Sequence, residues 1–226
     1  MILKGDGLLS ILVAMIKHLP NILTLMRLAL TLVFLGMILV SPGVERRAAF
    51  LDWAFVLFIV AAVTDVVDGY VARRYNATSK FGRMLDPLVD KVLVCGAFIC
   101  LAIIGEPKLF GLSGVTLAII QWFIVAVVVF RETYVTILRH IAESKGVNFA
   151  ATKSGKFKML TQSVAIGVIL MKMAHFQATW ADVLTAVILA VMVAATAISG
   201  VLATRRPSWK QAQGNANPHD PAATSA

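Results

Sequence analysis

Six stretches of the chain are mainly apolar, and each is long enough to form a helix that crosses a membrane. A hydrocarbon layer of about 30 Å needs roughly 20 helical residues. The short segments between the stretches contain Pro, Gly and charged residues, which are typical of turns. The pattern therefore predicts an all-α integral membrane fold with six transmembrane helices, at about 20–40, 49–74, 84–104, 112–142, 155–175 and 178–203.

The two ends of the chain depart from this pattern. Residues 1–19 combine apolar residues with lysines that can reach lipid headgroups, which predicts an amphipathic interfacial helix rather than a cleavable signal peptide. From residue 205 onward Pro, Gln, Asn, Ala and Ser replace the apolar runs, and this composition predicts a disordered tail. The expected organisation is an interfacial helix over 1–19, one six-helix membrane domain over 20–204 and a disordered tail over 205–226.

The composition supports a membrane protein. Of the 226 residues, 59% are hydrophobic and 15% are charged, whereas about a quarter are charged in a typical soluble domain. The formal net charge of +9 would suggest nucleic acid on a soluble protein, but on an apolar chain it suggests an anionic membrane surface. We therefore expect the lipid bilayer as a partner, and no nucleic acid.

The Lys and Arg residues are divided unequally between the two sides of such a bundle. If the first residue is cytoplasmic, most of them fall on the cytoplasmic side. Cytoplasmic loops of membrane proteins carry an excess of these residues. We therefore expect both chain ends, and the turn between the second and third helices, to be cytoplasmic.

Four aspartates lie close together where the pattern predicts membrane. Asp65 and Asp68 are three residues apart at the end of the second stretch, and Asp86 and Asp90 are four apart at the start of the third. Each spacing places a pair on one helical face, so a short turn would bring the four carboxylates together. A buried Asp costs roughly 2.5 to 3.5 kcal/mol in a membrane helix, and like charges repel, so we expect cations at this site.

The surrounding residues indicate which cations and which ligand. Carboxylates without His or Cys favour Mg²⁺ or Mn²⁺, two divalent ions would balance four negative charges, and ion pairs of this kind assist displacement at phosphorus. Gly69, Ala72 and Gly82 lack bulk where a ligand would approach the backbone. Arg73 can hold a phosphate through paired hydrogen bonds. A cation transporter is disfavoured because its acids should lie near mid-membrane, without neighbouring arginines.

The string D-x-x-D-G-x-x-A-R, followed after eight residues by G-x-x-x-D-x-x-x-D, resembles the signature of the CDP-alcohol phosphotransferases, which are six-helix membrane enzymes and usually homodimers. The resemblance implies that a hydroxyl attacks a CDP-linked donor and releases CMP. It implies that the two metal ions are bound by Asp65, Asp68, Asp86 and Asp90, with Asp90 also the catalytic general base. It implies CDP binding by Asp65, Asp68, Gly69, Ala72, Arg73 and Gly82.

Further segments resemble the bacterial phosphatidylglycerophosphate synthases of that family: 20–27, 130–139 and 154–162. This likeness implies CDP-diacylglycerol as donor, sn-glycerol 3-phosphate as acceptor, and a bacterial inner membrane. Arg131 and Arg139 are eight residues apart, about 80° around a helix, so both can face one cavity. We expect Arg131, Arg139 and Lys156 to bind the acceptor phosphate, with Lys158 a poorer candidate.

Several alternatives remain open at this point. Another acceptor is conceivable: inositol phosphate would use the same three cations, whereas phosphatidylglycerol or serine would not need them. A non-enzymatic cation-binding membrane protein is the alternative of a different class. Glu132 either orients Arg131 or Arg139 through an ion pair or is a solvated or helix-paired glutamate. His140 is a boundary residue or assists the acceptor, and a nucleotide contact at Asn21, Thr24 and Arg27 is a hypothesis. Cys95 and Cys100 lack zinc-site spacing, so we expect both in the core.

Overall fold

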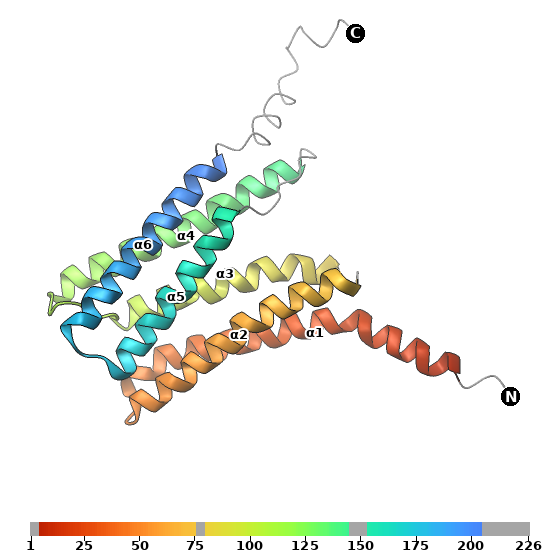
Figure 1. Ribbon diagram of the computed structural model, residues 1–226, viewed down its shortest axis with the longest axis horizontal. Coiled ribbons are helices and arrows are strands. Elements are labelled where there is room, and N and C mark those ends of the chain that lie inside the picture. Colours follow the sequence, from red (N-terminus) through yellow and green to blue (C-terminus); the bar gives the residue numbers. More distant parts are fainter. Residues whose placement is uncertain (1–4, 76–79, 145–152, 205–226) are drawn as a thin grey trace, which may run out of the picture.

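The computed structural model describes residues 5–75, 80–144 and 153–204, with side chains at 22, 24–64, 88–89, 91–142, 144 and 157–204. Six α-helices and one short 3-10 helix follow one another in this part (Figure 1): α1 Gly5–Val40, η1 Ser41–Gly43, α2 Arg47–Tyr75, α3 Lys80–Ile103, α4 Gly114–Ser144, α5 Lys153–His175 and α6 Thr179–Thr204. The described residues contain no strand, so the all-α prediction is confirmed.

Five of the helices contain segments long and apolar enough to cross a membrane. These segments are Thr24–Gly43, Arg47–Thr64, Gly114–Ala142, Phe157–His175 and Thr179–Thr204. The remaining helix, α3, lies at the third predicted stretch, and its described apolar part is the shorter segment Lys91–Ile103. The chain is therefore an integral membrane protein with a helix at each of the six predicted positions.

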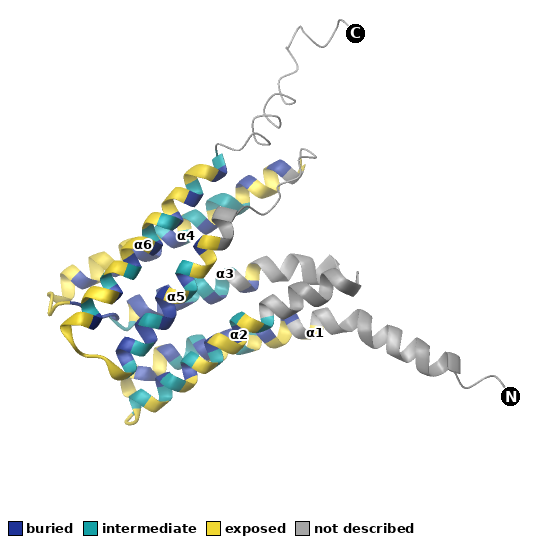
Figure 2. Ribbon diagram, in the orientation of Figure 1, coloured by how far each residue is buried: buried dark blue, intermediate teal, exposed yellow. Residues whose placement is uncertain are grey.

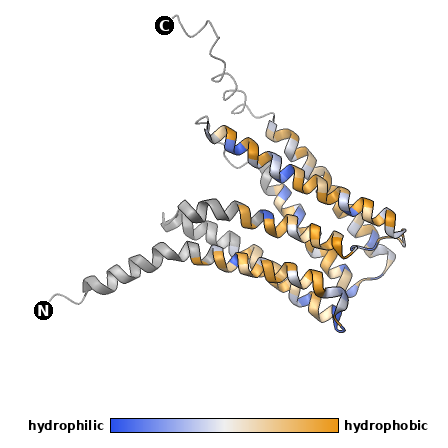
Figure 3. Ribbon diagram, turned by 180° about the vertical axis from the view of Figure 1, so that it is seen from behind, coloured by the Kyte–Doolittle hydropathy of each residue, from blue (hydrophilic) through white to orange (hydrophobic). Residues whose placement is uncertain are grey.

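Each helix exposes large apolar side chains on its outer face (Figure 2). Phe130 of α4 is 72% exposed and Trp53 of α2 is 70% exposed. Most of the described part of the helical ribbon takes the colours of hydrophobic residues when it is coloured by hydropathy (Figure 3). Such faces would be unfavourable in water, but they match lipid tails, which are as apolar as leucine.

Helix α1 is continuous from Gly5 to Val40. The expected interfacial helix and the first predicted transmembrane stretch therefore form one helix, with no break at Pro20. The position of residues 5–19 on a membrane surface stays a prediction. Residues 1–4 and the expected disordered tail at 205–226 lie outside the described residues.

The helices form a closed ring of neighbours. Helix α1 packs against α2 and α3, α4 against α3 and α6, and α5 against α6 and α2. Small residues allow two of these close approaches. A Cβ on Gly96 of α3 would lie 2.7 Å from Cδ1 of Leu35 in α1, and a Cβ on Gly167 of α5 would lie 3.1 Å from Cε2 of Phe55 in α2.

Ion pairs fix the end of the bundle that carries η1 and residues 104–113 and 176–178, which we call the loop end. Arg47 Nη2 lies 2.9 Å from Glu106 Oε1, joining α2 to the loop after α3. Lys172 Nζ lies 2.9 Å from Asp182 Oδ1, joining α5 to α6. His175 Nε2 lies 2.7 Å from Asp52 Oδ1, joining α5 to α2. These pairs hold the helices together at the loop end, whereas Arg131, Lys158 and Ser199 lie toward the opposite end of the bundle.

Candidate active site

The predicted metal and CDP residues fall within two helices. The bounds of α2 include Asp65, Asp68, Gly69, Ala72 and Arg73, and those of α3 include Gly82, Asp86 and Asp90. Their side chains, like that of Lys156, lie outside the described residues. Four carboxylates remain a suitable oxygen donor set for Mg²⁺ or Mn²⁺, and the roles of all these residues stay predictions.

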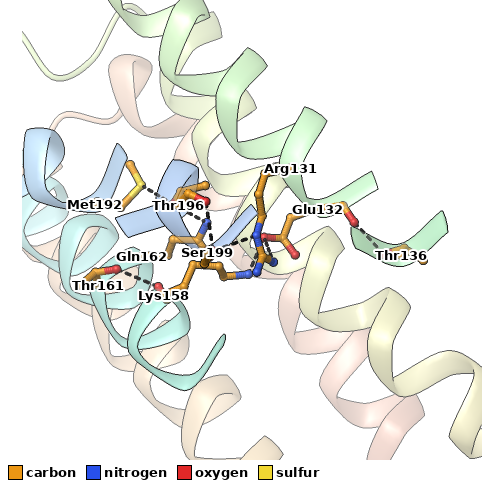
Figure 4. Close-up of polar contacts among 9 residues, drawn as sticks. All are labelled: Arg131, Glu132, Thr136, Lys158, Thr161, Gln162, Met192, Thr196 and Ser199. Atoms are coloured by element: carbon orange, nitrogen blue, oxygen red, sulfur yellow. Dashed lines mark hydrogen bonds and ion pairs between the residues drawn. The ribbon is translucent and has the colours of Figure 1, made fainter. Parts of the chain in front are cut away.

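A polar cluster formed by α4, α5 and α6 lies in the described part of the chain (Figure 4). We call it the Arg131 cluster; its members are Arg131, Glu132, Lys158 and Ser199. Arg131 Nη1 lies 3.1 Å from Glu132 Oε1, and Lys158 Nζ donates to the same carboxylate oxygen. Arg131 Nε–H also donates to Ser199 Oγ over 3.1 Å. Three helices are therefore joined through one arginine and one carboxylate.

The cluster forms because charged residues continue the buried stripes of their helices. On α4, Ile124, Val128 and Glu132 follow at intervals of four residues, and all three are buried. On α5, Lys158 and Gln162 continue the stripe of Ile166 in the same way. A four-residue spacing keeps side chains on one face of a helix, so the apolar packing of α4 and α5 turns Glu132 and Lys158 inward.

The three charges of the cluster are largely shielded from solvent. The side chain of Lys158 is 7% exposed, and those of Arg131 and Glu132 are each 11% exposed. Buried charges are tolerated when they are paired and hydrogen-bonded. Among the described side chains of the cluster, Arg131 and Lys158 both face the carboxylate of Glu132, so these side chains carry one surplus positive charge. An anion bound here would complete its charge balance.

A second layer of hydrogen bonds supports the cluster from α5 and α6. Ser199 Oγ–H donates to the carbonyl oxygen of Thr196 over 3.0 Å. Gln162 Nε2 lies 3.5 Å from Thr196 Oγ1, whose hydroxyl lies 3.7 Å from Met192 Sδ. The Gln162 side chain is buried, and its Oε1 has no hydrogen-bond partner among the described groups.

The structure groups the candidate acceptor residues differently from the sequence analysis. Arg131 lies with Lys158, which the sequence ranked lower. Arg139 is exposed further along α4 and forms no hydrogen bond or ion pair with the described members of the cluster, and His140 beside it is also exposed. Acceptor binding by Arg139 and Lys156 stays a prediction.

Sequence reasoning missed the contribution of α6. Its buried residues recur every three or four positions and include Thr185, Thr196 and Ser199. Hydroxyl residues at this spacing within an apolar helix indicate a polar inner face, and this signal was available from the sequence. The sequence could not show which residue contacts that face, because Arg131 lies 68 residues away from Ser199 in the chain.

The remaining candidates are resolved in part. Glu132 pairs with an arginine, so the ion-pair alternative is confirmed and the solvated one is wrong. Cys95 and Cys100 belong to the core, as predicted. Thr24 and Arg27 are buried in α1, and the hypothesis that they contact a nucleotide stays untested.

Comparison with known proteins decides the family. The family model described as CDP-alcohol phosphatidyltransferase matches residues 17–199, a range that holds the aspartate motif and the whole Arg131 cluster. The chain is a CDP-alcohol phosphatidyltransferase family member. The resemblance given by the aspartate motif is therefore confirmed.

Curated relatives of this phosphatidyltransferase cover most of its length. A probable phosphatidylglycerophosphate synthase of Mycobacterium tuberculosis is 33% identical over 191 residues, which is 83% of this chain and 80% of the relative. The CDP-diacylglycerol–glycerol-3-phosphate 3-phosphatidyltransferase of Bacillus subtilis is 34% identical over 168 residues, covering 71% of this chain and 80% of the relative. An enzyme of the same name from Cereibacter sphaeroides is 38% identical over 158 residues, covering 66% and 62%.

Proposed function

We propose that this phosphatidyltransferase transfers the phosphatidyl group of CDP-diacylglycerol to sn-glycerol 3-phosphate. A hydroxyl oxygen of the acceptor forms a bond to the phosphatidyl phosphorus, the bond from that phosphorus to the CMP oxygen breaks, and CMP leaves. The product is phosphatidylglycerophosphate. The names of the relatives support this reaction and this acceptor, and the surplus positive charge of the Arg131 cluster is the structural observation that supports an acceptor carrying a phosphate.

The Arg131 cluster suits a phosphate monoester. A guanidinium has five N–H donors in a planar fork that matches phosphate, and an ammonium has three. Arg131 and Lys158 each use only part of this capacity on Glu132 and Ser199. The acceptor phosphate would take the remaining donors and supply the negative charge that Glu132 alone does not.

The aspartate motif supplies the chemistry in this proposal. Asp65, Asp68, Asp86 and Asp90 would hold two Mg²⁺ or Mn²⁺ ions, which neutralise the diphosphate of the donor when bound. Arg73 binds a phosphate oxygen of CDP, and Gly69 and Gly82 let the nucleotide approach the backbone. Asp90 takes the proton from the acceptor hydroxyl as the new bond to phosphorus forms. The support for these roles is the match of the motif to the family.

The membrane placement follows from the same reasoning. The excess of Lys and Arg on one side supports cytoplasmic chain ends and a cytoplasmic active site. The bacterial relatives support a bacterial inner membrane. We also propose a homodimer, as is usual in the family. In this arrangement the acyl chains of the donor stay in the bilayer, while its CDP group enters the active site at the cytoplasmic side.

A panel of acceptors tests the proposed function. Purified protein in detergent is given CDP-diacylglycerol and Mg²⁺ with sn-glycerol 3-phosphate, inositol phosphate, phosphatidylglycerol or serine, and CMP release is measured. We expect release with sn-glycerol 3-phosphate and dependence on the divalent ion. No release with any acceptor would contradict the enzyme assignment, and release with inositol phosphate alone would contradict the acceptor assignment.

A further inference from the structure

Two adjacent residues of α6, Ser199 and Gly200, hold the side chain of Arg131, and we call them the α6 seat. Ser199 Oγ accepts the Nε–H of Arg131 over 3.1 Å. A Cβ on Gly200 would lie 3.4 Å from Cγ of Arg131, so the backbone of α6 passes directly beside the aliphatic part of the arginine. Ser199 therefore contacts the polar part of the Arg131 side chain (Figure 4), and Gly200 leaves space beside its apolar part.

The orientation of the Ser199 hydroxyl is set by its other hydrogen bond. Its only hydrogen is donated to the carbonyl oxygen of Thr196 over 3.0 Å. A hydroxyl has one donor and two acceptor lone pairs, so Ser199 can only accept from Arg131. Ser199 is 4% exposed, which leaves little room for water to replace it as acceptor.

These contacts fix the plane of the guanidinium. Ser199 holds Nε and Glu132 holds Nη1, so two of the five N–H groups of Arg131 are engaged with described side chains. Together with Cδ, the two anchored nitrogens define the plane in which the other three N–H groups lie. Paired hydrogen bonds to a phosphate depend on that plane, because the fork is rigid.

We propose that Ser199 is a positioning residue that orients Arg131 for the phosphate of the acceptor. This inference rests on the proposed function, in which Arg131 binds that phosphate. Ser199 does not touch the acceptor and acts only through the arginine. Helix α6 therefore influences acceptor affinity although it carries none of the four motif aspartates.

Ser199→Ala is the direct test, because it removes the acceptor oxygen at almost constant volume. We expect the KM for sn-glycerol 3-phosphate to rise about tenfold, the usual effect of losing a hydrogen bond to a charged group. The kcat and the KM for CDP-diacylglycerol should change less than about twofold. Ser199→Thr keeps the hydroxyl and should restore the acceptor KM.

Thr204→Ala is the matched control. Thr204 lies on the same helix and donates to Val201 O in the same way, but it does not contact Arg131. Its removal should leave both KM values unchanged. A similar rise of the acceptor KM in Thr204→Ala and Ser199→Ala would show a general effect on α6 and would overturn the proposal.

Arg131→Lys separates this proposal from the proposed function. Lysine has no Nε–H, so Ser199→Ala should add nothing to the KM increase of Arg131→Lys. An increase with Arg131→Lys but none with Ser199→Ala would overturn the positioning role alone. No increase with Arg131→Lys would instead overturn the acceptor role of Arg131. A lower Tm and kcat in Ser199→Ala with an unchanged KM for sn-glycerol 3-phosphate would show that Ser199 contributes only to packing and would also overturn the positioning role.

Discussion

Lys158 of α5 and Glu132 of α4 form an ion pair inside the helix bundle, with side chains 7% and 11% exposed. Arg131 shares the same carboxylate oxygen. A charge that loses its only buried partner is left uncompensated, and this costs more than the pair itself contributes. Glu132 is therefore the residue on which the two cations of the cluster depend.

Glu132→Gln should destabilise the protein markedly. It leaves Arg131 and Lys158 without their carboxylate, and breaking a buried pair costs about 3 kcal/mol. Thermal unfolding in detergent should show a lower Tm, and added phosphate should restore part of it by supplying an anion. Glu45→Gln, at an exposed position, is the control. Equal melting of Glu132→Gln and the wild type would mean that the cluster needs no carboxylate.

Lys158→Met should weaken acceptor binding more than Lys156→Met. Lys158 belongs to the Arg131 cluster, and methionine keeps much of its volume while removing the charge. We expect the KM for sn-glycerol 3-phosphate to rise about tenfold or more, as for a charge-assisted hydrogen bond. Steady-state CMP release at varied acceptor concentration measures this. A larger rise of the KM in Lys156→Met would contradict this prediction and would favour Lys156, as the sequence did, as the lysine that binds the acceptor phosphate.

Asp90→Asn should abolish turnover and leave most CDP-diacylglycerol binding intact. The amide cannot take the proton of the acceptor hydroxyl, while the donor is held by other groups. CMP release and donor binding are measured on the same preparation, with Asp52→Asn at the loop end as control, because Asp52 pairs with His175. Near-normal turnover of Asp90→Asn would exclude the general-base role.

Gly96→Ala should lower stability by about 1 to 3 kcal/mol, the usual cost of overpacking. The new Cβ would lie 2.7 Å from Cδ1 of Leu35, so either the Leu35 side chain must change its conformation or α3 and α1 must move apart. Gly36→Ala is the matched helical control, since nothing lies within 4 Å of its added Cβ. Unfolding by heat should separate the two variants. Equal Tm values would show that the α1–α3 contact adapts without cost.

The helices were predictable from the sequence because a membrane demands long apolar runs, whatever their partners. The continuity of α1 was less predictable: the sequence analysis separated an interfacial helix over 1–19 from a transmembrane stretch that begins at about residue 20, yet one helix runs through this segment to Val40. A proline removes one helical hydrogen bond and need not end a helix when packing continues beyond it. Boundaries set by packing are therefore weakly encoded in local sequence.

The choice between Lys156 and Lys158 shows where local reasoning fails for the site. Residues two apart point about 200° apart around a helix, so only one of them continues the inner face of α5. Resemblance to a motif does not fix that rotation. The buried positions Gln162 and Ile166 do, and they place Lys158 inward. Arg139 shows the same limit, since about 80° from Arg131 is enough to leave it exposed on α4.

The most direct test of the central claim is the acceptor dependence of Arg131→Gln. The rate of CMP release is measured at saturating CDP-diacylglycerol and Mg²⁺ with sn-glycerol 3-phosphate, and with glycerol as the acceptor that lacks the phosphate. If the Arg131 cluster binds the phosphate, kcat/KM for sn-glycerol 3-phosphate falls at least about tenfold, and kcat/KM for glycerol does not change. An unchanged KM for sn-glycerol 3-phosphate, or an equal loss with both acceptors, would contradict it.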